Sequence, residues 1–110
     1  MELKAHASGK TQILELGGRF DAYGAPQVVK WFDENLTAGS GNIVVDLAGV
    51  NFIDSTALAT LVQGMKRARQ ANGDLRLCSL QQPVRIIFEL TRLDKAFDIF
   101  ASQAEALAAG

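Results

Sequence analysis

Cysteine and histidine are almost missing from this sequence of 110 residues, which contains one of each, Cys78 and His6. A single cysteine allows no internal disulfide, and one Cys with one His cannot supply an ordinary zinc site, so we expect no metal. No apolar run approaches the roughly 20 residues that span a bilayer, and residues 1–6 lack the layout of a signal peptide. These absences predict a reduced, cytoplasmic protein with no membrane insertion.

The chain also lacks an excess of charge of either sign, because 11 Lys and Arg stand against 12 Asp and Glu. A general nucleic-acid binder normally carries a basic excess, so we expect no direct nucleic-acid partner. The hydrophobic fraction of 48% and the charged fraction of 21% are typical of a folded globular domain and exclude a disordered chain. The length predicts one domain over residues 1–110, since half of this chain would be too short to hold a core.

Motifs of the common enzyme classes are lacking as well. No phosphate-binding G-x-x-x-x-G-K-[ST] and no G-x-G-x-x-G after a strand occurs, so Gly17-Gly18 is read as a turn. Acyl transfer of the serine type needs a base beside its nucleophile, and nothing places His6 near a hydroxyl. We therefore expect a protein that is not an enzyme and needs no cofactor, with a nucleotide-binding enzyme as an alternative from another class.

What the sequence does contain is an alternation of short strands and amphipathic helices. Alternating residues at 3–7 and 11–16 predict an opening hairpin, and residues 17–24 are read as a loop. Pro26 suits the first turn of a helix, which Gly39-Ser40-Gly41 is expected to end. The apolar positions of this helix have helical spacing: Val28, Val29, Phe32 and Leu36.

The middle of the chain gives the strongest pattern. Residues 42–47 are apolar on consecutive positions, as in a strand covered on both faces, and residues 50–53 continue it after a break at Ala48-Gly49. Asp54-Ser55-Thr56 then supplies three consecutive N-cap residue types, and Asn72-Gly73 ends the helix that follows. The apolar face of this helix comprises Leu58, Leu61, Val62, Met65 and Ala68.

The last third of the chain repeats the alternation. Residues 74–80 read as a strand, and residues 97–100 as a short final strand. Pro83 begins a helix between them, and Ser102 caps a terminal helix. The expected inward residues of these two helices are Val84, Ile87, Phe88 and Leu90, and Ala104, Leu107 and Ala108. The order ββαβαβαβα predicts an α/β fold with a mixed, mostly parallel central sheet under helical cover.

Two clusters of charged residues are candidates for function, each with a simpler reading. Asp21, Asp46 and Asp54 could lie together at the carboxyl ends of strands, where open α/β sheets bind ligands. The simpler reading, which the sequence favours, is that they are turn and capping residues. The basic residues Lys66, Arg67 and Arg69 could form a partner-binding patch or the solvated face of one helix.

The stretch from Val44 to Leu58, which reads VVDLAGVNFIDSTAL, resembles the signature of STAS domains, specifically the bacterial anti-sigma-factor antagonists. The later stretch from Pro83 through Leu93-Asp94 to Phe97 is similar to the second motif block of that family. Two positions depart from the family pattern, because Ala57 and Arg92 stand where glycine is usual. Ala57 is expected to add a methyl group where a partner approaches, and Arg92 to be strained if its turn is left-handed.

The resemblance implies a regulatory protein that an anti-sigma-factor serine kinase phosphorylates on Thr56, with Ser55 as the lesser candidate. The unphosphorylated form would bind that kinase and release the sigma factor, and a PP2C-type phosphatase would reset the cycle. The implied partner-binding residues are Asp21, Asp54, Ser55, Thr56, Ala57 and Leu58. The alternative within the family is a STAS module of another system, such as a stressosome component or the accessory subunit of a phospholipid-transport ATPase.

Overall fold

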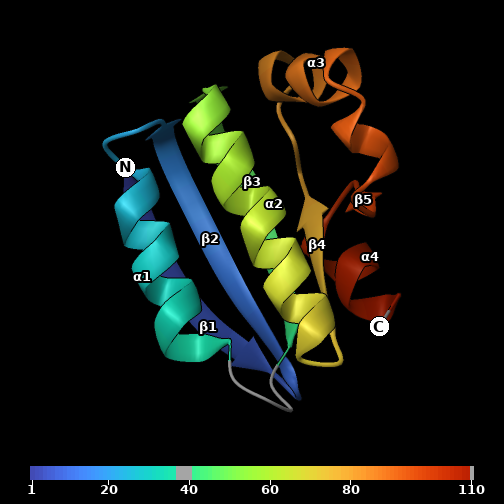
Figure 1. The fold of residues 1–110 in the computed structure, drawn as a ribbon. Helices are drawn as coiled ribbons and strands as arrows, with labels where there is room; N and C mark the ends of the chain where they lie inside the picture. Colours follow the sequence, from blue (N-terminus) through green and yellow to red (C-terminus); the bar gives the residue numbers. More distant parts are fainter. Residues whose placement is uncertain (37–40, 110) are drawn as a thin grey trace.

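The computed structural model describes residues 1–36 and 41–109, which form one five-stranded sheet and its covering helices (Figure 1). The sheet order is β1-β2-β3-β4-β5, with β1 and β2 antiparallel and the remaining neighbours parallel. The strands are β1 (Glu2–Ser8), β2 (Thr11–Phe20), β3 (Asn42–Ile53), β4 (Asp74–Cys78) and β5 (Ile99–Phe100). The helices are α1 (Ala25–Asn35), α2 (Ser55–Gln70), α3 (Gln82–Leu90), the short 3₁₀ helix η1 (Leu93–Lys95) and α4 (Gln103–Ala108). The predicted α/β class and element order are confirmed, with η1 as an unpredicted addition.

The helices bury the two faces of the sheet in two clusters. Helices α1 and α2 lie over one face, where the larger cluster gathers side chains such as Leu14, Val45 and Leu61 (Figure 1). Helix α4 covers the opposite face, where Ala106 packs in a smaller cluster with Val44. Both faces of β3 are therefore covered, which explains why its first half is apolar on consecutive positions.

Four predicted boundaries are wrong, and long-range strand pairing explains the two at residues 17–20 and 48–49. Residues 17–20 are not a loop, because β2 continues to Phe20 alongside β3. The expected break at Ala48-Gly49 is a shift of register within one continuous strand, β3. Strands β4 and β5 are each two residues shorter at one end than predicted. The helix stop expected at Gly39-Ser40-Gly41 falls mostly outside the described residues, and α1 ends at Asn35.

Several residues predicted to face inward are exposed. Leu90 is 76% exposed, since α3 covers only the end of the sheet and ends at this residue. Val29 is 41% exposed, and Trp31 is buried in α1 instead. In α4 the buried residue is Ala106, whereas the alanines expected inward, Ala104 and Ala108, are exposed. The capping role of Ser102 is confirmed, because its side chain accepts a hydrogen bond from the Glu105 N–H.

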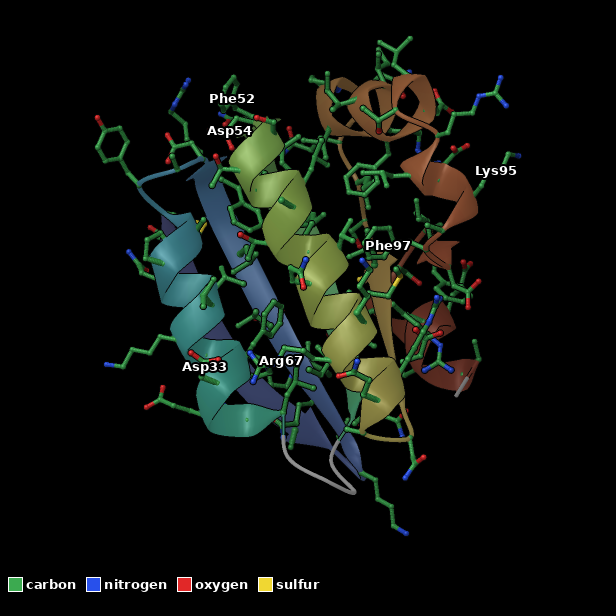
Figure 2. All side chains as sticks on the ribbon, in the orientation of Figure 1. Asp33, Phe52, Asp54, Arg67, Lys95 and Phe97 are labelled. Carbon is green, nitrogen blue, oxygen red and sulfur yellow. The ribbon has the colours of Figure 1, made fainter. Side chains whose placement is uncertain are left out.

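The basic residues of α2 are largely engaged within the chain. Arg67 pairs with Asp33 of α1 at 2.6 Å (Figure 2), and Arg69 pairs with Asp74 at 3.1 Å and donates to the Ala96 carbonyl. Lys66 is exposed. These contacts favour a solvated helix face over a partner-binding patch, because the two arginines bind other parts of the same chain.

Arg92 occupies the left-handed region, with φ of 62°, directly after α3. This conformation costs a residue with a side chain about 1–2 kcal/mol, whereas glycine adopts it freely. We expect Arg92→Gly to raise the free energy of unfolding by about 1 kcal/mol, measured by urea denaturation. The control is Arg85→Gly within α3, which should lower it by about 1 kcal/mol because glycine is a poor helix former. A lower free energy of unfolding for Arg92→Gly than for the parent would contradict backbone strain at Arg92.

Candidate partner-binding site at the start of α2

Asp54 builds the site by joining two elements that are far apart in the sequence. It follows β3 and is the N-cap of α2, where one carboxylate oxygen accepts from the Ala57 N–H at 2.9 Å. The other oxygen accepts from the Ala22 N–H at 3.0 Å, in the loop between β2 and α1. The helix start and that loop are therefore held together by one side chain (Figure 2).

Asp21 shapes the neighbouring loop in a similar way. One of its carboxylate oxygens accepts from the Tyr23 and Gly24 N–H groups at 3.0 and 3.1 Å, which is a turn-forming arrangement. The other oxygen lies 3.7 Å from the Arg19 guanidinium. That guanidinium also stacks on the Phe52 ring, with 3.9 Å from its central carbon to the ring centroid. Asp21 and Asp54 are thus the turn and capping residues of two adjacent segments, and both lie at the end of the sheet where β2 and β3 finish.

Ser55 and Thr56 form the first turn of α2, and both are exposed. Among the described residues, neither backbone N–H has a hydrogen-bond partner, as is usual for the first residues of a helix. The Thr56 carbonyl accepts a hydrogen bond from the Thr60 hydroxyl at 3.0 Å, which stabilises the first turn of the helix. Two accessible hydroxyl groups therefore stand at the positive end of a helix of 16 residues.

Ala57 and Leu58 do not present their side chains to a partner. Ala57 is completely buried and Leu58 is 8% exposed, and both belong to the large core cluster. The expectation that the Ala57 methyl lies where a partner approaches is wrong, because the third residue of α2 turns inward under Asp54. Ala57 therefore leaves access to the two hydroxyl groups unchanged.

Asp46 does not join the other two aspartates. It lies in the middle of β3 and is 9% exposed, with its oxygens accepting from the Ala48 N–H at 2.8 Å and the Gln103 amide at 2.6 Å. The same amide nitrogen donates to Glu15 at 2.7 Å, so Gln103 of α4 joins two carboxylates on neighbouring strands. Asp46 helps to hold α4 on the sheet, so the alternative in which the three aspartates gather at one ligand site is wrong, and the simpler reading of turn and capping residues holds for Asp21 and Asp54.

Sequence reasoning missed the apolar side chains around the hydroxyl groups. Phe52 at the end of β3 is 37% exposed, and Tyr23 in the loop after β2 is 91% exposed. On α3, Ile86 is 41% and Leu90 is 76% exposed, and α3 lies at the same end of the sheet as the start of α2 (Figure 1). The glutamine before α3 ties that helix to β3, since the Gln81 amide donates to the Ala48 carbonyl at 2.6 Å. In the sequence Phe52 and Leu90 read as core positions, whereas Tyr23 lies in a predicted loop. No local signal marks these residues as one exposed apolar surface.

The described residues show neither a metal centre nor a membrane span. No group of three or more His, Cys, Asp or Glu side chains in residues 1–36 and 41–109 could hold a metal ion. Within the same ranges, no helix combines the length and apolar character needed to cross a bilayer. His6 is exposed on the edge strand β1.

Cys78 lies completely buried on β4, in the cluster under α4. The pKa of its thiol is raised from 9.0 to about 11, mainly by burial; a hydrogen bond with Ser79 lowers the pKa, and the carboxylates of Asp46 and Glu15 raise it, all within that total. The thiol is therefore neutral at pH 7 and shielded from reagents. We expect Ellman's reagent to label Cys78 at pH 8 only as fast as the protein opens.

The same pKa shift makes stability depend on alkaline pH. Because the folded-state pKa is the higher one, the contribution is complete below pH 9 and is lost as pH rises towards about 11, when the unfolded thiol ionises first. The complete loss amounts to about 3 kcal/mol, at about 1.4 kcal/mol for each of the two pKa units between 9.0 and about 11. Comparing urea unfolding of the parent and Cys78→Ala between pH 8 and 11 isolates this contribution. Parallel curves for the two proteins would contradict it.

Comparison with known proteins settles the family. The sequence pattern of the STAS domain family matches residues 2–106. This chain belongs to the STAS domain family. The resemblance carried by the Val44–Leu58 stretch is thereby confirmed.

Several relatives of this STAS domain are named anti-sigma factor antagonists. The anti-sigma-B factor antagonist of Listeria monocytogenes is 31% identical over 99 residues, which cover 90% of this chain and 86% of that protein. A crystal structure of a Thermotoga maritima protein, 28% identical, matches with a TM-score of 0.91 over 97% of this chain and 92% of that one. The Bacillus determinant SpoIIAA in its phosphorylated form, 17% identical, shares the fold with a TM-score of 0.77 over 98% of each chain.

Proposed function

We propose that this STAS domain is an anti-sigma-factor antagonist that binds an anti-sigma serine kinase in its unphosphorylated form and so releases the sigma factor. Phosphorylation of Thr56, or less favourably of Ser55, ends the binding, and a PP2C-type phosphatase restores it. The names of its relatives support the antagonist role. The observation that carries the switch is the exposed hydroxyl of Thr56 in the first turn of α2, beside backbone N–H groups that have no partner among residues 1–36 and 41–109.

The surroundings of Thr56 suit both a kinase active site and a protein interface. Asp54 and Asp21 fix the backbone on either side of the hydroxyl group, so it is presented on a rigid support. The exposed side chains of Phe52, Ile86 and Leu90 supply apolar area at the same end of the molecule. Such apolar residues contribute most of the affinity in protein interfaces, while the polar groups give register.

A phosphate on Thr56 would change binding through charge with little change of fold. The positive end of α2 favours an anion, so the phosphorylated domain should remain folded. The modification adds about 1.5–2 negative charges, which a covering partner must desolvate. One unfavourable contact between unit charges at about 4 Å costs on the order of 4 kcal/mol at an effective dielectric near 20. Inverting a 99:1 bound population requires about 5.5 kcal/mol, which such a contact plus desolvation can supply.

The site of modification is tested by mass spectrometry. We expect incubation with its cognate anti-sigma serine kinase and ATP to add one phosphate, located on Thr56 by peptide mapping. Thr56→Ala should accept no phosphate, because the acceptor oxygen is gone, while Ser55→Ala should be phosphorylated at a similar rate. Each variant must first match the parent in circular dichroism. Phosphate found only on Ser55 would overturn the assignment to Thr56, and no phosphate on either residue would overturn the proposed switch.

A further inference from the structure

The turn between α2 and β4 contains Asn72-Gly73, the one place in the sequence where glycine follows asparagine. Asn72 is exposed, and its φ of 65° lies in the left-handed region in which many helices end. The other three asparagines precede bulky side chains, since Leu36, Ile43 and Phe52 follow them. Glycine has no side chain to hinder the approach of its own backbone nitrogen to the preceding side-chain amide. Asparagine is a thermolabile residue, and Asn72 is therefore the most labile one in this chain.

Loss of the Asn72 amide is a reaction of the chain with itself and with water. The Gly73 nitrogen loses its proton and forms a bond to the Asn72 side-chain carbonyl carbon, while the bond from that carbon to the amide nitrogen breaks and ammonia leaves. The product is a cyclic imide. Water then opens the imide at either of its carbonyl groups. One opening gives aspartate, and the other gives isoaspartate, in which the main chain runs through the former side-chain carbonyl. The reaction needs no oxidant and no cofactor.

The fold holds the attacking nitrogen back from this reaction. The Gly73 N–H donates a hydrogen bond of 2.9 Å to the Ala68 carbonyl in the last turn of α2, so the nitrogen keeps its proton until that bond opens. The Asn72 N–H donates to the Arg69 carbonyl at 3.2 Å. The Gly73 backbone also packs directly on that of Gly41, because a Cβ atom on Gly73 would collide with it. A backbone amide held in this way reacts only through local opening of the structure.

The same contacts leave no room for the isoaspartate product. Isoaspartate inserts one methylene group into the main chain directly before Gly73, which packs on Gly41 and is bonded to the end of α2. The next residue, Asp74, begins β4 in register with Asn42 of β3. A longer main chain must displace either the helix end or this first pair of the two strands. Both products also add a negative charge at the C-terminal end of α2, where the helix dipole disfavours it.

We propose that Asn72 is a modification site that the folded state protects. Its amide is lost when the end of α2 opens, and the isoaspartate that results destabilises the chain when it refolds. The modification marks chains that have spent time unfolded, and it creates a substrate for enzymes of the isoaspartate methyltransferase class. Asn72 lies at the opposite end of α2 from Thr56 (Figure 1), so this inference does not depend on the proposed partner switch.

The test compares the loss of the amide in folded and unfolded protein. Samples are held at pH 8 in buffer and in denaturing guanidinium chloride, and peptide mapping follows the mass gain of one dalton at residue 72. Methylation by an isoaspartate methyltransferase with labelled S-adenosylmethionine detects the isoaspartate. We expect the reaction at Asn72 to be at least about tenfold slower in the folded protein. Hydrogen exchange of the Gly73 amide should be slowed as well, because it requires the same opening.

Two variants separate the effect of charge from that of main-chain length. Asn72→Asp carries the new charge on a normal main chain and should raise the unfolding constant by only about two- to fivefold. Refolded chains with isoaspartate at this position should unfold at a lower guanidinium concentration than Asn72→Asp. Asn72→Gly retains the left-handed conformation and should show no mass gain in this peptide.

Three results would overturn the proposal. Equal rates of amide loss in the folded and unfolded protein would show that the fold gives no protection. A refolded isoaspartate chain as stable as Asn72→Asp would show that the longer main chain fits beside Gly41. A faster reaction at another asparagine of the unfolded chain would show that Asn72 is not the labile site.

Discussion

Thr56→Asp should weaken binding to the anti-sigma kinase by about 100- to 1000-fold, because it places a carboxylate where the proposed interface must exclude water. The fold should persist, since an acidic residue in the first turn of a helix interacts favourably with its positive end. We expect the free energy of unfolding to equal or slightly exceed that of the parent. Titration calorimetry measures the affinity, and urea denaturation measures the stability of the same sample.

Thr56→Asn separates the effect of charge from that of shape. Asparagine is close in size to aspartate but neutral, so it should weaken kinase binding by less than about tenfold, with each tenfold equal to about 1.4 kcal/mol. The effect of Thr56→Asp should also shrink as salt is raised, because screening weakens the charge contact. Equal losses for the two variants would show that shape, and not charge, disturbs the interface.

Gly64→Ala should destabilise the fold by about 2 kcal/mol, although alanine is the better helix former by about 1 kcal/mol. A Cβ atom at Gly64 would lie 2.5 Å from the Phe32 ring and 3.1 Å from Leu75. Both neighbours are buried in the core between α1, α2 and β4, so neither can move away without disturbing its own packing. Close packing against Phe32 and Leu75 therefore explains the glycine in the middle of α2. Urea or thermal unfolding measures the loss.

A second substitution tests the cause of that loss. Phe32→Leu opens space at the ring that the new methyl group would meet, and alone it should cost about 1 kcal/mol through lost burial. Combined with Gly64→Ala, the two losses should not add, since the smaller side chain accommodates the methyl group. Additive losses in the double variant would contradict contact with Phe32 as the origin of the effect.

The sequence is informative where a structural signal is local. The N-cap role of Asp54, the buried face of α2 and the cap at Ser102 follow from residue type and helical spacing, and the structure confirms all three. The sequence does not decide whether the turn at Arg92 is left-handed, although the family pattern has glycine there. The structure shows that it is, with φ of 62°. Local hydrogen bonding and periodicity decide these features, so no distant residue is needed to predict them.

The sequence is uninformative where distant segments decide the outcome. The hydrogen bond from the Ala22 N–H to Asp54 spans 32 positions, and no pattern in the sequence indicates it. The extension of β2 over Gly17 to Phe20 depends on pairing with β3, although glycines normally mark a turn. Leu90 reads as a core residue, but its exposure depends on where α3 lies relative to the sheet.

The proposed switch depends on the negative charge that phosphorylation adds at Thr56. The most direct measurement is calorimetric titration of the kinase with this domain in its unmodified form and in its form phosphorylated on Thr56, in the same buffer and salt. We predict tight binding of the unmodified domain and a loss of at least about 1000-fold for the phosphorylated one, or about 4 kcal/mol. Equal affinity of the two forms would contradict the proposed switch, however closely the fold matches its family.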